Sequence, residues 1–343
     1  MSGLAGGVSL KSKPSSTPAV YVALAGDLLV ALAKSVASIW TGSSAMASEA
    51  IHSFVDAGNE ILLLYGIHRA GRRADIEHPL GYGRELYFWS FIVAVLVFAF
   101  GAGFAVYEGV NHIRQPEPIQ HPLVNYAVLG FALVIDGWSW LVSFKQFRAA
   151  KGELGFYEAF RRSKDPPSFM VLFENSAALL GLLIAAIGTF AAIALKQPVL
   201  DGVASIIIGL LLGATAALLA RESKSLLIGE QADAHLSKSI LAIAAAQPSV
   251  SQANGLLTVQ LAPDQIVAAL SLKFADNLRA AEIEDQVIAL EQKVRAAHPE
   301  VVLLFIKPQT DTTYSAQRQR RFGKIGGIPL ATARGTKAQS DDD

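Results

Sequence analysis

The chain has 343 residues, of which 52% are hydrophobic and 17% are charged, and its formal net charge is zero. Soluble domains carry charge on roughly 25% of their residues, so this sequence is short of charge for its length. A neutral chain gives no electrostatic reason to expect a nucleic-acid partner. Because the sequence contains no cysteine, it excludes disulfides and thiolate metal sites, and any metal must bind histidine, carboxylate, amide or water.

Long apolar segments fill the first two thirds of the chain. A helix that crosses a hydrocarbon core of ~30 Å needs ~20 mostly apolar residues. Six segments qualify, and they cover about residues 19–40, 44–70, 86–113, 122–149, 168–195 and 198–220. Glycine and proline in the breaks favour turns. The sequence therefore predicts an all-α domain of six transmembrane helices over residues 19–225, after a flexible tail over residues 1–18 that is not a signal peptide.

Basic residues mark every second connection. They gather in the N-terminal tail, in the second and fourth connections and after the sixth span, at Lys11, Lys13, Arg69, Arg72, Arg73, Arg84, Arg148, Lys151, Arg161, Arg162, Lys164, Arg221 and Lys224. The other connections contain only Arg114 and Lys196. Since loops rich in Lys and Arg stay in the cytosol, we expect both termini there. The predicted location is a bacterial inner membrane, or an organelle membrane in a eukaryotic host.

The pattern changes after Glu230, where the density of charge becomes that of a soluble domain. Periodicity predicts helices over 234–247 and 280–298 and strands over 255–261, 265–275 and 301–306. This order indicates a small cytosolic α+β domain, ferredoxin-like (αββαβ), over residues 226–309. Residues 310–343 are polar, and we expect them to be disordered.

The second span contains ionisable side chains at a depth where charge is expensive. His52 and Asp56 are four residues apart, so they share one helix face. An imidazole and a carboxylate placed in this way are two ligands for a borderline cation such as zinc. The alternative is a hydrogen-bonded pair that joins two helices. Because ionisable groups at this depth in the bilayer are usually functional, the interpretation as metal ligands is favoured over the helix-joining pair.

The fifth span has one polar cluster, Glu174 and Asn175. At 1.5 Å rise per residue, the midpoint of His52 and Asp56 lies ~18 Å from the outer end of its helix, and Asn175 lies ~12 Å from the inner end of its own. The two depths add up to the thickness of the core, so the clusters can face each other near the midplane. Further along the span, Ala177, Gly181 and Ala185 recur every four residues and form a face of small residues on which a neighbouring helix could pack closely.

Three further acids lie in predicted spans. Asp27 could supply a carboxylate at the same level, or pair two helices. Asp136 is interpreted as structural or as a proton carrier. Asp201 begins the sixth span, where a negative charge stabilises a helix N-terminus.

Several motifs together resemble the cation diffusion facilitator family of proton-coupled zinc and metal transporters. They are Thr41-Gly42-Ser43, Ser48-Glu49-Ala50-Ile51-His52-Ser53-Phe54-Val55-Asp56, His78-Pro79-Leu80-Gly81-Tyr82-Gly83-Arg84, Tyr107-Glu108-Gly109-Val110 and Phe173-Glu174-Asn175-Ser176. The resemblance covers about residues 20–308. It is strongest to the branch that contains the ninth human zinc transporter and bacterial relatives.

In that family a tetrahedral site takes two ligands from the second helix and two from the fifth. His52 and Asp56 match the first pair, whereas Val171 and Asn175 stand where the second pair is expected. Glu174 is a substitute carboxylate one position away, turned by ~100° on the helix. The resemblance therefore leaves Glu174, Asn175 or Asp27 to complete the metal site.

A loop that binds a second zinc in many family members departs from the pattern. It keeps Asp75, Glu77 and His78 but has Tyr82 in place of a histidine. The C-terminal domain resembles the family's dimerising domain without its clusters of metal ligands.

The resemblance implies a homodimeric antiporter in the lipid bilayer that is not an enzyme and has no cofactor. It would export a divalent cation, zinc first, in exchange for protons. Two alternatives stay open. One is a transporter of manganese, iron or cobalt, which an oxygen-rich site would suit. The other is a non-transporting scaffold or heterodimer partner, because the fifth-helix carboxylate is missing.

Overall fold

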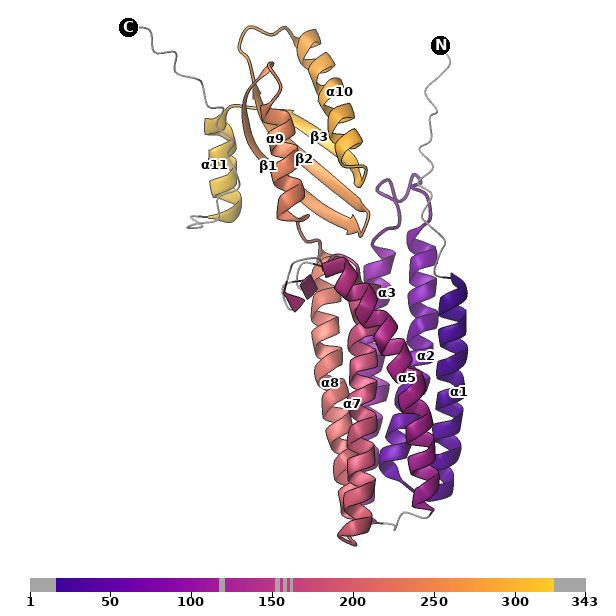
Figure 1. The fold of residues 1–343 in the computed structure, drawn as a ribbon. Helices are drawn as coiled ribbons and strands as arrows, with labels where there is room; N and C mark the ends of the chain where they lie inside the picture. Colours follow the sequence, from indigo (N-terminus) through magenta and orange to yellow (C-terminus); the bar gives the residue numbers. More distant parts are fainter. Residues whose placement is uncertain (1–16, 117–120, 152–154, 157–158, 161–162, 324–343) are drawn as a thin grey trace, which may run out of the picture. The chain divides into compact units, whose positions relative to one another are not determined.

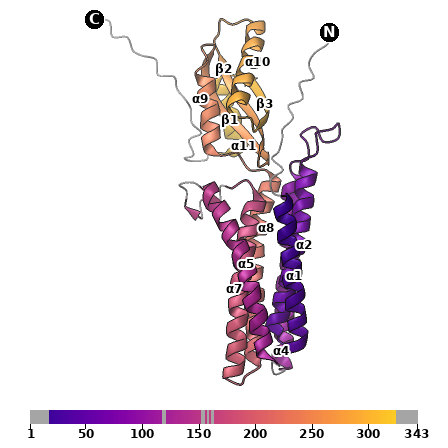
Figure 2. The same cartoon turned by 45° about the vertical axis from the view of Figure 1, so that its right-hand side comes forward.

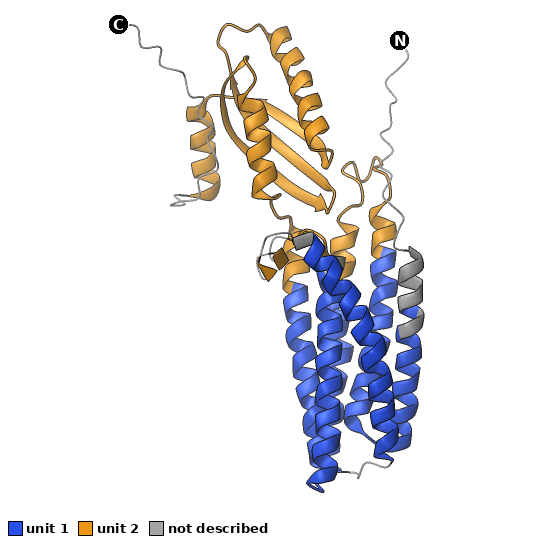
Figure 3. Ribbon diagram, viewed as in Figure 1, with its two compact units in different colours: residues 1–65, 92–152, 167–220 blue, residues 66–91, 153–166, 221–343 orange. Residues whose placement is uncertain are grey.

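A computed structural model describes residues 17–116, 121–151, 155–156, 159–160 and 163–323. The chain divides into two compact units (Figure 3), the first made of residues 1–65, 92–152 and 167–220 and the second of residues 66–91, 153–166 and 221–343. Most of the tail expected over residues 1–18 lies outside the described residues.

Long helices build the first unit. They are α1 (Thr17–Thr41), α2 (Ser44–Ala70), α5 (Pro122–Lys151), α7 (Pro166–Ala194) and α8 (Val199–Ile228), with a helix in three parts, α3 (Glu85–Leu96), η1 (Val97–Ala102) and α4 (Gly103–Arg114). Figures 1 and 2 both show α1 beside α2 and α7 beside α8. Turn residues separate these helices as the sequence predicts, and Pro166 stands at the first position of α7, where its missing N–H has no partner to lose.

Four helical stretches in the described part of the chain are long and apolar enough to cross a membrane. They are Glu85–Arg114, Pro122–Ala149, Phe169–Ala194 and Val199–Ile228. This confirms the helical membrane domain. The first two predicted spans coincide with α1 and α2, but these helices are not among the four, so the count of six spans stays a prediction. In α2 the apolar pattern is interrupted by the ionisable residues described below.

Two features within the bundle were not predicted. The third predicted span contains a π-helical segment, η1, where the sequence suggested a continuous α-helix. In addition, α4 and α8 touch through their backbones. A β-carbon on Gly109 would lie 2.6 Å from the carbonyl oxygen of Gly202, and one on Gly202 would lie 2.8 Å from that of Gly109. Only glycine allows so close an approach at both positions.

The predicted order of elements appears in the C-terminal part of the second unit. It comprises α9 (Ala234–Ala245), β1 (Val250–Ala262), β2 (Gln265–Phe274), α10 (Ala280–Ala297) and β3 (Val301–Pro308). The sheet has the order β1-β2-β3, antiparallel between β1 and β2 and parallel between β2 and β3. Apolar residues of α9 and α10 pack on one face of it, including Ile240, Leu241, Leu290 and Val294. A mixed sheet with helices is therefore confirmed, and the ferredoxin-like assignment stays an expectation.

Three boundaries differ from the sequence-based expectation. The chain was expected to be disordered from residue 310, but α11 (Asp311–Phe322) is a helix, with Thr310 capping its N-terminus. Residues 324–343 lie outside the described residues. The strand β1 begins five residues before the predicted start at 255, because its first residues are mostly polar and carry no apolar alternation. Helix α8 continues to Ile228 through the basic residues that ended the sixth predicted span.

Candidate functional site

A small cavity in the first unit is lined by most of the ionisable residues that were singled out above in the predicted spans. Its volume is about 20 Å³, which is room for about one water molecule or ion. Nine residues of α1, α2, α5 and α7 line it, namely Asp27, Ser53, Asp56, Glu60, Asp136, Val171, Glu174, Asn175 and Ala178. Five of these carry carboxyl groups. Asp56 of the second predicted span and Glu174 and Asn175 of the fifth thus reach one cavity, as the depth estimate allowed.

His52 and Asp56 lie one turn apart on α2, as their spacing predicts. The Nδ1 atom of His52 is 3.4 Å from Oδ1 of Asp56. His52 is buried, and neither of its ring nitrogens has a hydrogen-bond partner among the described residues. Oδ1 of Asp56 is also buried, and it too forms no hydrogen bond within the described ranges. Buried polar atoms are nearly always hydrogen-bonded, so this pair is unsatisfied in a way that a bound cation would correct.

Glu174 and Asn175 both line the cavity, but each is held by other side chains. Asn59 of α2 donates a hydrogen bond to Oε1 of Glu174 over 3.2 Å. The amide nitrogen of Asn175 donates to the hydroxyls of Ser139 and Ser143 on α5, over 3.1 and 3.2 Å. The offset of one residue thus turns Glu174 toward α2 and Asn175 toward α5. Sequence reasoning missed Asn59, Ser139 and Ser143, which are polar residues on other helices.

Asp27 and Asp136 also reach the cavity, from α1 and α5. Glu60 of α2 lines the same cavity as Asp27, so two helices present carboxyl groups there. Asp136 lies 3.8 Å from the ammonium of Lys34. Asp136 therefore has a cationic partner, whereas Asp27 shares the cavity with other acids.

The predicted ligands do not form a closed coordination shell in this arrangement. Within the described ranges, no three His, Asp or Glu side chains converge as a group that could hold a metal ion. His52 and Asp56 lie close enough to act as one pair of ligands. A third ligand requires a side-chain movement, and Glu174, bonded only through the amide of Asn59, is the nearest carboxylate on the facing helix.

A further residue of this region that was not predicted is Lys34 of α1. Its side chain is fully buried and contacts Glu49 of α2, which is fully buried as well. A signal was present, because Lys34 follows Asp27 by seven residues, two helical turns, and so lies on the same face of α1.

Asp201 stabilises the beginning of two helices. It lies in the first turn of α8, as predicted. Its carboxylate also accepts hydrogen bonds from the hydroxyls of Ser43 and Ser44 and, over 3.2 Å, from the backbone N–H of Ala45. These groups form the N-terminus of α2. Asp201 therefore fixes the position of α2 and has no place in the cavity.

The loop before α3 in the second unit is organised around Asp75. This carboxylate accepts a hydrogen bond from the hydroxyl of Tyr82 over 2.6 Å and another from the backbone N–H of His78 over 2.7 Å. The two bonds, the first above all, hold the pKa of Asp75 below its usual value. Tyr82 thus fills the place of the missing histidine with a hydrogen-bond donor that supplies no metal ligand.

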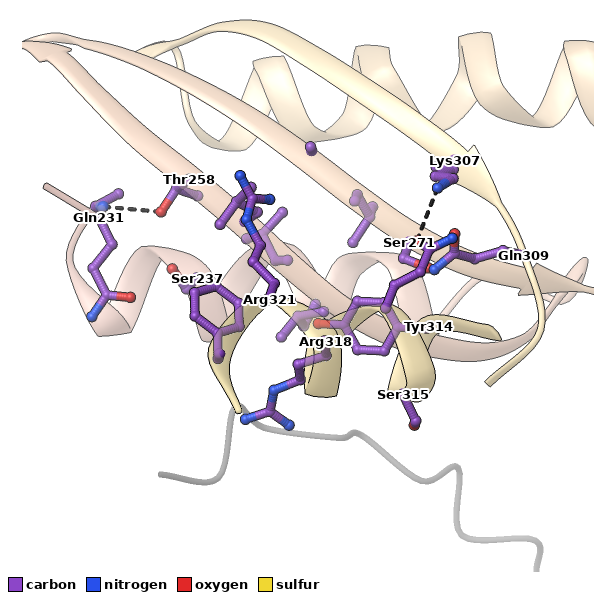
Figure 4. Close-up of a pocket in the computed structure, with 18 of the residues that line it drawn as sticks. Gln231, Ser237, Thr258, Ser271, Lys307, Gln309, Tyr314, Ser315, Arg318 and Arg321 are labelled. Carbon is purple, nitrogen blue, oxygen red and sulfur yellow. Dashed lines mark hydrogen bonds between the residues drawn. The ribbon is translucent and has the colours of Figure 1, made fainter. Parts of the chain in front are cut away.

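A larger cavity, of about 670 Å³, lies in the C-terminal part of the second unit (Figure 4). Strands β1 and β2, helix α9 and helix α11 line it, and Tyr314 and Arg321 extend from α11 toward the strands. Its lining includes Lys238, Lys307, Arg318 and Arg321 but no histidine or carboxylate. A cavity with this lining offers a divalent cation no carboxylate or imidazole ligand.

Comparison with known proteins identifies a family. The cation efflux transmembrane domain family matches residues 20–228, which is more than half of the chain. The range includes α1, α2, α5, α7 and α8, the helices that contribute to or surround the small cavity.

Several curated proteins are similar to this chain. The mitochondrial proton-coupled zinc antiporter SLC30A9 of Xenopus laevis is 38% identical over 213 residues, 61% of this chain and 38% of that protein. Metal tolerance protein C4 of Arabidopsis thaliana is 34% identical over 197 residues, 57% of this chain and 43% of that protein. The cation-efflux pump FieF of Cronobacter sakazakii is 24% identical over 292 residues, 83% of this chain and 89% of the pump.

The chain matches less than half the length of the zinc antiporter from Xenopus laevis and of the one from Homo sapiens, which is 37% identical over 213 residues. The likeness to these relatives therefore extends over only part of the longer proteins. These relatives are named as transporters of cations, not as enzymes. On the match over residues 20–228, the chain belongs to the cation efflux family of membrane transporters.

Proposed function

We propose that this protein is a secondary transporter that exports a divalent cation, zinc first, from the cytosol in exchange for protons. His52 and Asp56 would bind the cation from α2, and Glu174 would complete the site from α7, with Asn175 and Asp27 beside it. In this proposal six helices span the membrane, both termini are cytosolic, and two copies form a homodimer through their C-terminal domains.

One observation carries the proposal. His52 presents two buried ring nitrogens that accept or donate no hydrogen bond among the described residues, and they lie next to an oxygen of Asp56 that is unsatisfied in the same sense. A pair whose only role was to join two helices would satisfy these atoms with partners, because an unmet buried polar group costs ~1–3 kcal/mol. Imidazole nitrogen and carboxylate oxygen are also the ligands that zinc takes in proteins without cysteine.

The cavity beside the pair supports exchange with protons. It is large enough for one ion, and carboxyl groups from α1, α2, α5 and α7 line it. Carboxylates and imidazole both bind protons, so the side chains that release the metal can take up protons in its place. The name of the relatives at 37–38% identity, proton-coupled zinc antiporter, agrees with this chemistry.

The oxygen-rich lining favours a second candidate substrate. Five carboxyl groups and one amide surround the cavity, whereas His52 is the one imidazole of the proposed site. Such a set of ligands also suits manganese or iron, which are harder ions than zinc.

Flux in proteoliposomes tests the function. Purified protein is reconstituted with a pH-sensitive dye inside the vesicles, and zinc, manganese, iron(II) or cobalt is added in turn. We expect zinc to drive the largest proton flux, and His52→Ala and Asp56→Ala to abolish it. The matched control is His68→Ala, which changes an exposed histidine near the end of the same helix. Wild-type flux in either site variant, with its insertion verified, would remove α2 from the transport site.

A further inference from the structure

Lys34 is a buried cation in the middle of α1. Its side chain is fully buried, and its ammonium donates hydrogen bonds to Oε2 of Glu49 over 3.1 Å and to the hydroxyl of Ser53 over 2.9 Å. A third contact reaches Oδ2 of Asp136 over 3.8 Å. The partners belong to α2 and α5, so the three helices meet at one charge.

Two of these three partners connect Lys34 to the small cavity. Ser53 and Asp136 line the cavity, whereas Glu49 does not. The ammonium therefore lies directly behind the cavity wall, and only the Asp136 carboxylate and the Ser53 hydroxyl intervene. A positive charge in this position acts on any cation that enters.

A role confined to holding helices together does not explain the choice of lysine. Burying two opposite charges costs several kcal/mol per ion, and apolar pairs of similar volume often stabilise a protein equally well or better. The buried charge of Lys34 therefore has to act on something that an apolar side chain would not affect. The carboxylates around the cavity meet this requirement.

We propose that Lys34 is a tethered cation that sets the affinity of the transport site. Its ammonium neutralises Asp136 at the cavity wall and repels the divalent cation, so the site binds the ion weakly enough to release it. The inference rests on the proposed function and makes Lys34 a positioning residue that acts through Asp136, without touching the metal.

The expected effect is large enough to measure. A unit charge and a divalent cation ~10 Å apart at an effective dielectric constant of ~20 change a binding constant by more than ten-fold. Lys34→Met should therefore bind zinc at least about ten-fold more tightly than wild type and transport it with a lower maximal rate, because release becomes slower. Lys34→Arg keeps the charge and should stay close to wild type in affinity.

Asp136 provides the matched variants. Asp136→Asn removes the carboxylate that Lys34 neutralises and should weaken zinc binding, while the double variant Lys34→Met with Asp136→Asn should return toward the wild-type affinity. A double-mutant cycle on the affinity then measures the coupling between the two residues. The measurement is isothermal titration of zinc into the purified full-length protein in nanodiscs, with thermal unfolding recorded for every variant.

The outcomes separate the possibilities. If Lys34→Met loses thermal stability but binds zinc as wild type does, Lys34 only joins helices and the proposal is wrong. If that variant does not fold, Glu49→Gln replaces it, because freeing the ammonium from Glu49 should weaken zinc binding although Glu49 does not line the cavity, and unchanged affinity would overturn the proposal. Absence of zinc binding and zinc flux in wild type would instead overturn the proposed function.

Discussion

The carboxylate of Glu49 on α2 packs against the backbone of Gly181 on α7. A β-carbon on Gly181 would lie 2.2 Å from Oε1 of Glu49. We expect Gly181→Ala to push Glu49 away from Lys34 and to lower the free energy of unfolding by ~1–3 kcal/mol. Thermal unfolding in detergent measures this, and Gly130→Ala is the control because a β-carbon there meets open space. Equal stability of both variants would show that Glu49 moves aside without loss.

A second prediction separates the two polar residues of α7. Glu174→Gln removes a negative charge next to the proposed ligands and should stop transport, whereas Asn175→Ala should mainly weaken zinc affinity, since an amide binds a cation through its oxygen but carries no proton to exchange. Asn175→Asp should raise zinc affinity and alter the dependence of transport on pH, because neighbouring carboxylates compete for protons. Transport measured against pH for the three variants decides. Full transport activity of Glu174→Gln would mean that Asp27, not Glu174, supplies the carboxylate that completes the site.

A third prediction concerns the cap of α2. Asp201→Ala leaves the buried hydroxyl of Ser43 and the N–H of Ala45 without their acceptor and should lower the free energy of unfolding by ~1–3 kcal/mol. Asp201→Asn keeps one acceptor oxygen, so its free energy of unfolding should fall by less than that of Asp201→Ala. Thermal unfolding compares the variants with wild type. An unchanged melting temperature in Asp201→Ala would mean that other groups cap α2.

The loop before α3 gives a prediction about pH. The hydroxyl of Tyr82 keeps the pKa of Asp75 below its usual value, so this contact stabilises the loop above the ordinary pKa of an aspartate and is lost as pH falls through the lowered value. Tyr82→Phe should raise the pKa of Asp75 toward ~3.9. Carboxyl carbon NMR follows the titration, with Tyr107→Phe, an exposed tyrosine elsewhere, as the control. An unaltered pKa would assign the effect to the backbone of His78.

The C-terminal domain gives the fifth prediction. Residues 231–323, expressed alone, should form dimers and bind no zinc tightly. Apolar residues of α9, α10 and the sheet form a core of their own, and no group of three His, Asp or Glu in the described part of the chain could hold a metal. Analytical ultracentrifugation and calorimetry test the two statements separately. Submicromolar zinc binding would contradict the second.

Local patterns predicted the parts of the fold and the site that depend on spacing along one element. The facing positions of His52 and Asp56 follow from helical periodicity, and the order of elements after residue 230 follows from alternation and turn residues. The contacts of Asn175 with Ser139 and Ser143 could not be predicted in this way, because they depend on how α5 and α7 are rotated against each other.

Lys34 was missed for the same reason. Its spacing from Asp27 places it on the same face of α1, but its main partner, Glu49, is fifteen residues away on another helix, and no pattern within α1 indicates that partner. The helix α11 was missed because a polar composition resembles that of a disordered tail. Its capping residue, Thr310, was the available signal.

The glycine contact between α4 and α8 has a mechanical consequence for any change of shape in this bundle. With carbonyl oxygens of Gly109 and Gly202 each close to the other glycine, neither helix can slide along its neighbour without first separating from it. Helices packed in this way shift as a single rigid piece. Opening and closing around the carboxylate-lined cavity would then occur by displacement of other helices, such as α1 and α2, against an α4–α8 piece that keeps its internal geometry.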